Sequence, residues 1–419
     1  MRVTLLVAGT AGLHCGACVR DLALVRGLNA RGHDVTVMPL YLPLGPEHGD
    51  LATTPVQIDG INAWLQQASR MFRWTPAWFD LLLAAGPLLR LAGRSAGTTQ
   101  AAGLGPLTVS MLRGTEGNQR KQVAAMLDAL ARLRPEVVII SNALLLGLAP
   151  ALRAKLGVAV LCGLQGEEGF VDELPQPWRA QALALMREHA AAVDRFLAPY
   201  ASYAPAWLDL APERIAVLPT GIDLRLHHPA AEAPPLDGTL TVGFCSVLLR
   251  RKGPDLLVEA ATRLPTGLSR RIRLIIAGQP LDRDLLRALR HRCAAAGLAA
   301  EFPGGLEPAA KCRLMQSVHV FCAPSRTPEV RGLAGLEALA CGAPLVAADA
   351  GIFPELARSH EGITLVRPDD ADDLARSIAM QLADPAAARA RALRGAASVA
   401  VAHGQDAVGA LAEAILRRR

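Results

Sequence analysis

The chain has 419 residues, of which 51% are hydrophobic, and its formal net charge is +6. At roughly 150 residues per domain this length predicts two or three domains, each with a core of its own, and the hydrophobic content excludes a disordered chain. Lysines and arginines are dispersed, so the positive charge suits anionic small molecules or a membrane surface, and no motif supports nucleic-acid binding.

Membrane spans and disulfides have no support in the sequence. The longest apolar stretch, Leu81–Ala92, is interrupted by Pro87 and Arg90 and is too short to cross a bilayer. The first eight residues have a short apolar run and a single arginine, so we expect a buried strand there and not a signal sequence. Eight scattered cysteines imply no disulfide framework, and we therefore expect a cytoplasmic protein.

The chain opens with a βαβ pattern. After the first strand come a glycine-rich turn, a helix from about Val19 to Ala30 and a strand at Val35–Leu40. Short apolar strands that alternate with helices predict parallel sheets, with ligands at the carboxyl ends of the strands. The turn does not match GxGxxG and the chain has no P-loop, so dinucleotide and ATP sites lack a motif.

A CxxC motif, Cys15 to Cys18, stands where the first helix begins. A helix dipole lowers the pKa of a thiol at that position, so a redox-sensitive cysteine is one interpretation. Loop packing or contact with a substrate is a second. Zinc is a third, although the chain has no second CxxC or paired histidine motif and His14 is the near candidate ligand.

Residues 60–93 hold three of the five tryptophans together with Arg70 and Arg73. We expect a helical hairpin that packs on its own domain. Aromatic, apolar and basic residues together also favour a lipid interface or the wall of an acceptor pocket.

Several later strands end in polar residues or glycines. A strand at Pro135–Ala143 precedes a helix, and the next strand runs into Gln165 and Glu167. A further strand leads to a basic turn that ends at Lys252, followed by a helix with proline at its start. Two more strands end near Gly278 and Gly304.

The stretch Phe321–Leu356 predicts a strand, a binding loop, a helix and a strand. Apolar residues recur at helical spacing from Leu333 to Ala340, and Gly342 followed by Pro344 is a stop signal. The helix amino terminus next to Glu329 is a site for phosphate.

Glu337 lies one turn further along this helix, and its carboxylate can accept hydrogen bonds from two adjacent sugar hydroxyls. Phosphate and sugar together describe a nucleotide-sugar.

The spacing Glu329-x7-Glu337, followed by ALACGAPLVAADAG and then PE, resembles the retaining glycosyltransferases of the GT-B fold, family 4 (glycosyl transferases group 1). The runs RGHDVTVMPLY at 31–41 and IAVLPTGIDLRLHHP at 215–229 resemble the same family. The resemblance therefore covers nearly the whole chain.

The resemblance implies an α/β GT-B fold, in which two Rossmann-like domains face a central cleft. We expect an acceptor-side domain at 1–228 with a helical insert at about 60–112, a linker at 229–237, a nucleotide-sugar-binding domain at 238–395, and a C-terminal helix at 396–419 that packs back across the linker.

The implied activity is transfer of a hexosyl group, with retention, from a UDP- or GDP-sugar to a hydroxyl acceptor in glycan or glycolipid assembly. The acceptor could be lipid-linked, with peripheral contact to the inner membrane face through about 60–93. No metal or other cofactor is expected, since the pairs Asp369-Asp370 and Asp372-Asp373 lie beyond the implied site.

The resemblance also assigns roles to single residues. Catalytic roles fall to Glu329, Lys252 and Arg251. Donor contacts are expected from Glu337, Gly332, Leu333, Ala334, Gly278 and Gly304, and contacts on the acceptor or sugar side from Gly12, Gly16, Gln165 and Glu167. Two departures from the family pattern are Val247 in place of an arginine and Gln165 in place of a histidine.

Two alternatives to a transferase remain open. A sugar-nucleotide epimerase would use the same donor site without an acceptor, and a non-catalytic homologue would bind the nucleotide-sugar alone. A glycoside hydrolase fits poorly, because it needs carboxyl groups on opposite sides of the scissile bond, whereas Glu329 and Glu337 share one loop and helix.

Overall fold

The computed structural model describes residues 1–9, 16–45, 49–58, 60–73, 75, 103–203, 205–236 and 238–418, with backbone alone at 16–19 and 61. The chain divides into two compact units, Met1–Pro219 with Asp406–Arg419, and Thr220–Gln405. The chain passes from the first unit to the second after Pro219, nine residues before the predicted domain limit at residue 228. It returns to the first unit at Asp406, in the last helix.

The first unit is built on a parallel six-stranded sheet with the order β2-β1-β3-β4-β5-β6. Its strands are β1 (Arg2–Val7), β2 (Asp34–Pro39), β3 (Val137–Ile140), β4 (Ala159–Gly163), β5 (Arg195–Ala198) and β6 (Ile215–Val217). The opening βαβ unit is confirmed, since β1 pairs in parallel with β2 and their inward-facing valines and leucines are buried.

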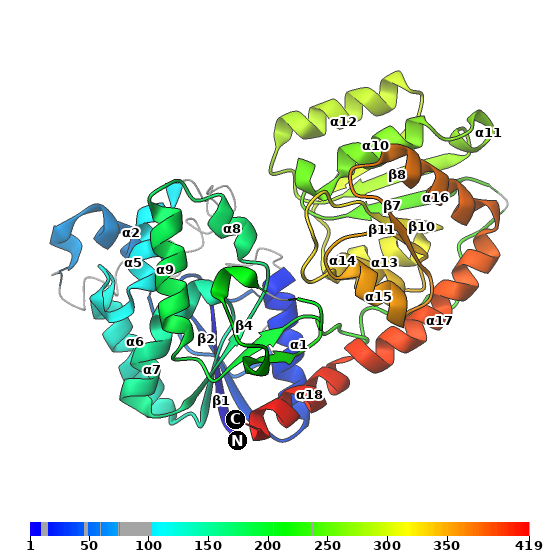
Figure 1. Ribbon diagram of the computed structural model, residues 1–419. Helices are drawn as coiled ribbons and strands as arrows, with labels where there is room; N and C mark the ends of the chain where they lie inside the picture. The colour runs from blue at the N-terminus through cyan, green and yellow to red at the C-terminus, as the bar shows by residue number, and fades with distance from the viewer. Residues whose placement is uncertain are drawn as a thin grey trace. The chain divides into compact units, whose positions relative to one another are not determined.

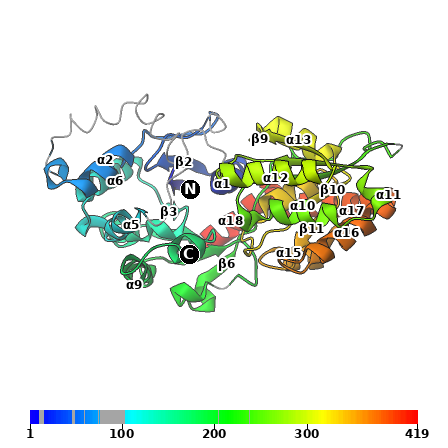
Figure 2. The ribbon, with the colours of Figure 1, turned by 90° about the horizontal axis from the view of Figure 1, so that it is seen from above.

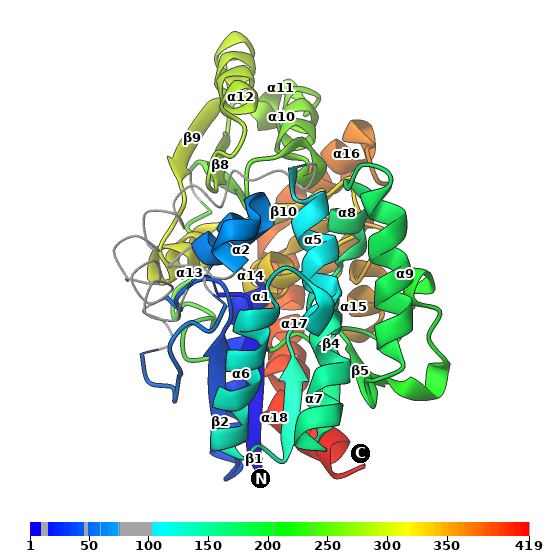
Figure 3. The same ribbon diagram turned by 90° about the vertical axis from the view of Figure 1, so that its left-hand side faces the viewer.

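Helices cover both faces of this sheet. They are α1 (Gly16–Ala30), α2 (Gly60–Ala68), α5 (Gly105–Leu112), α6 (Arg120–Leu133), α7 (Ala149–Leu156), α8 (Glu168–Asp172), α9 (Trp178–Ala190) and α18 (Gln405–Arg417). One apolar core joins the sheet to α1 and α18, while α6, α7 and α9 lie on the other face (Figures 1 and 3). The predicted terminal helix thus packs on the first unit.

The second unit has a parallel six-stranded sheet with the order β12-β11-β10-β7-β8-β9. Its strands are β7 (Leu240–Cys245), β8 (Ile272–Ala277), β9 (Ala299–Gly304), β10 (Val320–Ala323), β11 (Leu345–Ala348) and β12 (Ile363–Val366). The strand order reverses between β7 and β10, which are neighbours in the sheet although many residues separate them in the chain.

The helices of the second unit also form two layers. They are α10 (Pro254–Thr262), α11 (Thr266–Ser269), α12 (Arg283–Ala295), α13 (Pro308–Ser317), α14 (Leu333–Ala340), α15 (Phe353–Ser359), α16 (Ala371–Ala383) and α17 (Pro385–His403). An apolar core holds α10, α12 and α16 against one face, with α10 between the other two (Figures 1 and 2). On the opposite face α14 contacts α13 and α17.

Close packing of the last helix yields a test of how the first unit is held together. A Cβ atom added at Gly409 on α18 would lie 2.4 Å from the carbonyl oxygen of Gly27 on α1. We expect Gly409→Leu to cost about 1–3 kcal/mol through overpacking and to speed hydrogen exchange in α1 and α18, measured by mass spectrometry. Ala414→Leu adds a similar side chain at an exposed position of the same helix and should change neither. Unchanged exchange in the Gly409 variant would contradict this account of the packing.

Candidate functional site

The candidate site lies at the carboxyl edge of the second sheet, where the strand order reverses. β10 pairs with β7 through Val320 with Val242 and Phe321 with Gly243. The chain leaves β7 toward the basic turn and leaves β10 toward the loop that carries Glu329, so the two segments emerge side by side. Such reversal points are where open parallel sheets bind ligands.

The basic turn is a short 3-10 helix, η8 (Arg250–Lys252), that ends at Gly253 in the left-handed conformation with φ 74°. A Cβ atom at Gly253 would lie 2.0 Å from the Pro324 carbonyl oxygen. Glycine therefore lets the turn approach the end of β10, and Pro254 then begins α10 at a position where its missing N–H costs nothing.

Lys252 and Glu329, predicted separately as catalytic residues, form an ion pair. The Lys252 Nζ donates to Glu329 Oε1 at 2.6 Å, and each side chain is about one fifth exposed (22% and 21%). The backbone of Glu329 is fixed by the segment after β11, because its carbonyl accepts from the Ile352 N–H at 2.8 Å. Glycine is needed at position 351, since a Cβ atom there would lie 2.2 Å from the same carbonyl oxygen. The pair joins the loop after β10 to the turn after β7.

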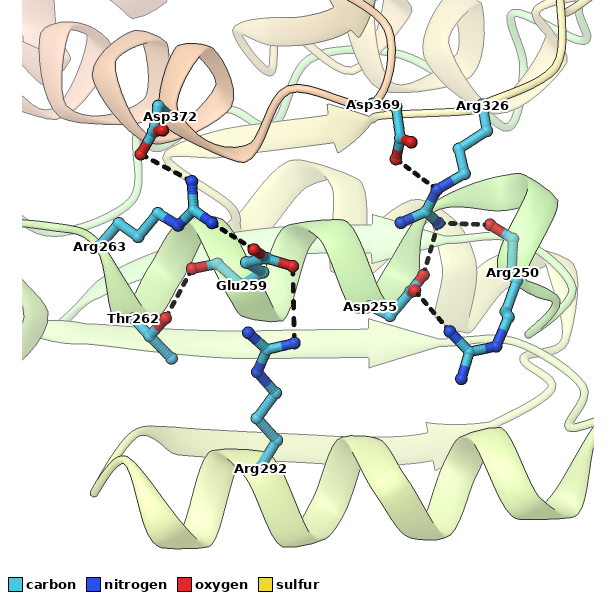
Figure 4. A network of polar contacts seen from close by, with 9 residues as sticks. All are labelled: Arg250, Asp255, Glu259, Thr262, Arg263, Arg292, Arg326, Asp369 and Asp372. Atoms are coloured by element: carbon cyan, nitrogen blue, oxygen red, sulfur yellow. Dashed lines mark hydrogen bonds and ion pairs between the residues drawn. The ribbon is translucent and has the colours of Figure 1, made fainter.

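Arg326, which the sequence analysis did not single out, straps the loop to the turn (Figure 4). Its guanidinium contacts Asp255 at 2.7 Å and Asp369 at 2.6 Å, and it donates to the Arg250 carbonyl at 2.7 Å. Its backbone N–H and the Ser325 hydroxyl both donate to the Arg251 carbonyl, at 2.8 and 3.0 Å. Five contacts thus fix the loop ahead of Glu329.

The two arginines of the turn are both exposed, and they take part in different contacts. The Arg250 guanidinium lies 3.3 Å from Asp255 and its side chain is 71% exposed (Figure 4). Arg251 is exposed as well, and its carbonyl anchors the loop.

Helix α14 begins directly after this loop. Gly332 is its N-cap residue with φ 57°, and its carbonyl accepts from the Leu336 N–H at 2.9 Å. A Cβ atom at Gly332 would lie 2.6 Å from Ile352. The half-buried Leu333 and Ala334 form the first turn, so the amino terminus of this helix lies close to Glu329 in the chain.

Glu337 is more enclosed than the sequence suggested. The side chain is 2% exposed and forms an ion pair with Lys311 of α13, and the His227 Nε2 lies 3.6 Å from Glu337 Oε1. Burial opposes the charge on Lys311, but the Glu337 carboxylate outweighs it and raises the pKa of Lys311. Burial lowers the pKa of His227, so its imidazole is neutral at pH 7. Sequence reasoning missed Lys311 and His227 because they meet Glu337 through tertiary contacts.

Gly278 and Gly304 are brought together at the same sheet edge. The Gly278 N–H donates to the Gly304 carbonyl at 2.7 Å, and a Cβ atom at Gly278 (φ 146°) would lie 1.6 Å from the Ser246 carbonyl oxygen. The absence of a side chain at Gly278 therefore lets the ends of β7 and β8 approach each other.

In the first unit, Gln165 and Glu167 lie after β4 in a buried polar network. The Gln165 amide donates to the Ser141 carbonyl at 2.6 Å, and the Glu167 carboxylate accepts from the N–H groups of Ala143 and Gln165 at 2.9 and 2.8 Å. Burial raises the pKa of Glu167. Glu167 was expected on the acceptor or sugar side; in the structure its carboxylate is buried and accepts from two backbone N–H groups of the loops after β3 and β4.

The remaining predicted residues lie at the limits of the described structure. Gly12 and Cys15 fall outside the described residues, and Gly16 begins α1. Among the residues that the structure describes, no three His, Cys, Asp or Glu side chains lie close enough to hold a metal ion. Asp369 and Asp372 are paired with Arg326 and Arg263 instead (Figure 4).

Comparison with known proteins assigns each unit to a glycosyltransferase family model. Residues 231–398 match "Glycosyl transferases group 1" and residues 103–226 match "Glycosyltransferase Family 4". A D-inositol 3-phosphate glycosyltransferase of Mycolicibacterium paratuberculosis is 33% identical over 46% of this chain and 45% of its own length. The lipopolysaccharide core mannosyltransferase LpcC of Rhizobium leguminosarum is 34% identical over 46% of this chain and 53% of its own length. The matches thus span about half the length of these curated relatives.

Solved structures share the fold over the whole chain. Anabaena Alr3699/HepE, in complex with UDP and glucose, superimposes with a TM-score of 0.69 at 17% identity and covers 100% of both chains. Sucrose-phosphate synthase of Thermosynechococcus elongatus has a TM-score of 0.71 at 20% identity, over 100% of this chain and 98% of its own. With two parallel Rossmann-like sheets and both family matches in chain order, the protein belongs to the family 4 glycosyltransferases (glycosyl transferases group 1) and has their GT-B fold.

Proposed function

We propose that the chain transfers a hexosyl group from a UDP- or GDP-sugar to a hydroxyl acceptor with retention at the anomeric carbon. The observation that carries the proposal is the Lys252–Glu329 pair at the strand-order reversal, beside the amino terminus of α14. The bond from the anomeric carbon to the diphosphate oxygen breaks, and the acceptor oxygen takes its place. The products are the glycosylated acceptor, a nucleoside diphosphate and the proton of the hydroxyl.

Charge on the departing diphosphate is the main demand on this site. Lys252 and the free N–H groups of the first turn of α14 supply positive charge before the reaction begins, so no reorganisation is needed as the bond breaks. Glu329 would then bind hydroxyls of the donor sugar. The contacts of Arg326 fix the Glu329 loop relative to the turn that carries Lys252. Groups that are positioned in this way before the substrate binds lower the entropic part of the activation barrier.

A second cation is needed where Val247 departs from the family pattern. Arg250 turns to Asp255, which favours Arg251 as the arginine that reaches the diphosphate. We assign Glu337 to the ribose, with Lys311 and His227 setting the orientation of its carboxylate. Gly278 and Gly304 would admit the nucleotide base to the same sheet edge.

The first unit would bind the acceptor through Gly12 and Gly16, which follow β1 in the chain, and through Gln165, which follows β4. The relatives are named for transfer in inositol phosphate and lipopolysaccharide pathways, which supports an acceptor in glycan or glycolipid assembly. Product formed from nucleotide-sugar alone would indicate an epimerase, and nucleotide-sugar binding without turnover a non-catalytic homologue.

Substitutions in the basic turn test the diphosphate role. We expect Lys252→Ala to lower kcat/KM for a UDP- or GDP-sugar about 10²- to 10³-fold, because one preorganised cation is lost. Arg251→Ala should cost less, and adding Val247→Arg should restore part of that loss. Arg250→Ala is the matched control, with an effect below about fivefold because its pair is exposed. Normal turnover in a folded Lys252→Ala enzyme would refute the assignment.

A double-mutant cycle tests the pair beneath the ribose site. Lys311→Met alone leaves a buried carboxylate without its partner and should destabilise the second unit by about 3 kcal/mol, as should Glu337→Gln to a smaller extent. The double variant should be more stable than the sum of the single losses predicts, as measured by urea unfolding. Variants that alter Glu337 should weaken binding of the free nucleoside diphosphate most, because they remove the carboxylate, and Lys311→Met should weaken it less, because it removes only a group that orients the carboxylate. Additive losses would mean that the two side chains are not coupled.

Contact with lipid is proposed for the predicted segment at about 60–93, of which the structure describes residues 60–73 and 75. Trp64 on α2 and Met71 on η2 (Arg70–Arg73) are 60% and 67% exposed, with Arg70 exposed between them. Aromatic and apolar side chains beside a cation are typical of segments that lie on the membrane interface. None of the helices that the structure describes is both long and apolar enough to span a bilayer.

We therefore expect the protein to float with vesicles that contain anionic lipid, and the Trp64→Ser plus Met71→Ser variant to lose at least half of that binding. Leu411→Ser, which removes an apolar side chain that is 43% exposed on α18, is the control and should float like the wild type. Equal loss in both variants would point to a general solubility effect and against a membrane-binding segment.

A further inference from the structure

A cavity of about 240 Å³ lies in the second unit, away from the candidate donor site. Val318 and Pro344 in its wall precede β10 and β11 in the chain, so they lie at the amino ends of these strands. The loop with Glu329 follows the carboxyl end of β10. Because the strands are parallel, the cavity and the donor site occupy opposite edges of one sheet.

The walls of the cavity are mainly apolar and come from three places. Leu236 belongs to the segment just before β7, Val318 and Pro344 to the sheet edge, and Leu393 to α17. Leu236 and Leu393 are large hydrophobic residues that nonetheless remain 48% and 39% exposed. An apolar rim of this kind is a place for a ligand to bury carbon atoms.

One cationic side chain reaches this cavity, and its charge is not balanced by a described residue. The NH1 nitrogen of Arg389 is buried and has no hydrogen-bond partner in the described part of the chain. Asp384, at the start of the same helix, caps α17 by accepting from the Ala387 N–H. Burial lowers the pKa of Arg389, but a guanidinium keeps its proton at neutral pH.

His319, the other titratable residue among the described wall residues, gives Arg389 no hydrogen bond. Its Nδ1 accepts from the Thr241 N–H at 2.9 Å and its Nε2 lies 3.0 Å from the Pro235 carbonyl. These contacts fix the neutral tautomer with the proton on Nε2, and burial lowers the pKa of His319 in agreement. Both ring nitrogens are therefore used, and the imidazole adds no charge.

Arg389 is half-buried, but its NH1 nitrogen is enclosed without a hydrogen-bond partner, and a buried N–H that carries part of a positive charge is costly unless it meets an acceptor. We propose that the cavity is a binding site for a small carboxylate with a short apolar body, whose head group takes the orphan N–H of Arg389. At about 30 Å³ per water, the cavity volume equals that of roughly eight water molecules. The cavity therefore has room for a ligand of about six to eight non-hydrogen atoms. The body would lie between Leu236 and Leu393.

Hexanoate is the probe, with 1-hexanol and hexylamine as ligands of the same apolar length. Ligand-observed NMR should show hexanoate binding at least about tenfold more tightly than hexanol, because a charge-assisted hydrogen bond is gained, and no binding of hexylamine. Arg389→Met should abolish the preference for the carboxylate. Arg394→Met, which removes an arginine of the same helix that is paired at the surface, should keep it. Equal affinities for hexanoate and hexanol in the wild type would overturn the proposal.

Stability without ligand supplies a second readout that does not depend on the choice of probe. If Arg389 is uncompensated, Arg389→Met should raise the melting temperature of the ligand-free protein, and hexanoate should raise that of the wild type but not of the variant. A lower melting temperature in the Arg389→Met variant would reveal a structural partner for the guanidinium and would end the proposal. Glycosyl transfer in the absence of hexanoate should be unchanged by this substitution.

Discussion

The lateral pairing of β10 with β7 determines where each residue of the candidate donor site lies. Parallel strands deliver their following loops to one edge, and at this position the connections on either side run in opposite directions along the sheet. The basic turn and the Glu329 loop therefore face each other without a helix between them. Moving either strand by one place in the sheet would separate Lys252 from Glu329.

Around this edge the backbone approaches itself more closely than side chains would permit. Gly253 faces the Pro324 carbonyl, Gly278 faces the Ser246 carbonyl and Gly351 faces the Glu329 carbonyl, each at a distance that leaves no room for a Cβ atom. All three have positive φ angles, which glycine adopts at little cost. The site is thus assembled by main-chain contacts, and the charged side chains are supported on a rigid frame.

Much of this arrangement could be predicted, because strands, turns and helix ends leave local signals. The helix Leu333–Ala340, its stop at Gly342 and the parallel strands on either side followed from apolar spacing and glycine placement, and the structure confirms them. The burial of Glu337 against Lys311 and the strap formed by Arg326 leave no such signal. The partners named for Lys311 and Arg326 are 26 to 76 positions away in the chain, and only the packed sheet brings them together.

The burial of Glu167 could not be predicted for a similar reason, because it depends on contacts that form only in the folded chain. A loop with two consecutive glutamates suggests exposure, but the ends of β3 and β4 turn their N–H groups toward this carboxylate. Hydrogen bonds to an ionised oxygen are strong enough to hold a charge in a buried place. The sequence contains the glutamate, but one of its two donors, the Ala143 N–H, belongs to the segment after another strand.

The ion pair between Lys252 and Glu329 affects which anions can bind to the ligand-free protein. A lone ammonium at this edge would attract inorganic phosphate and other abundant anions, whereas the internal carboxylate already serves as its counter-ion. In the function proposed above, arrival of a diphosphate would exchange one anion for another at Lys252 and would release the Glu329 carboxylate toward the sugar hydroxyls. A ligand that offers phosphate without hydroxyls would pair with Lys252 but leave the Glu329 carboxylate without a partner, so the proposed site would favour ligands that carry both groups.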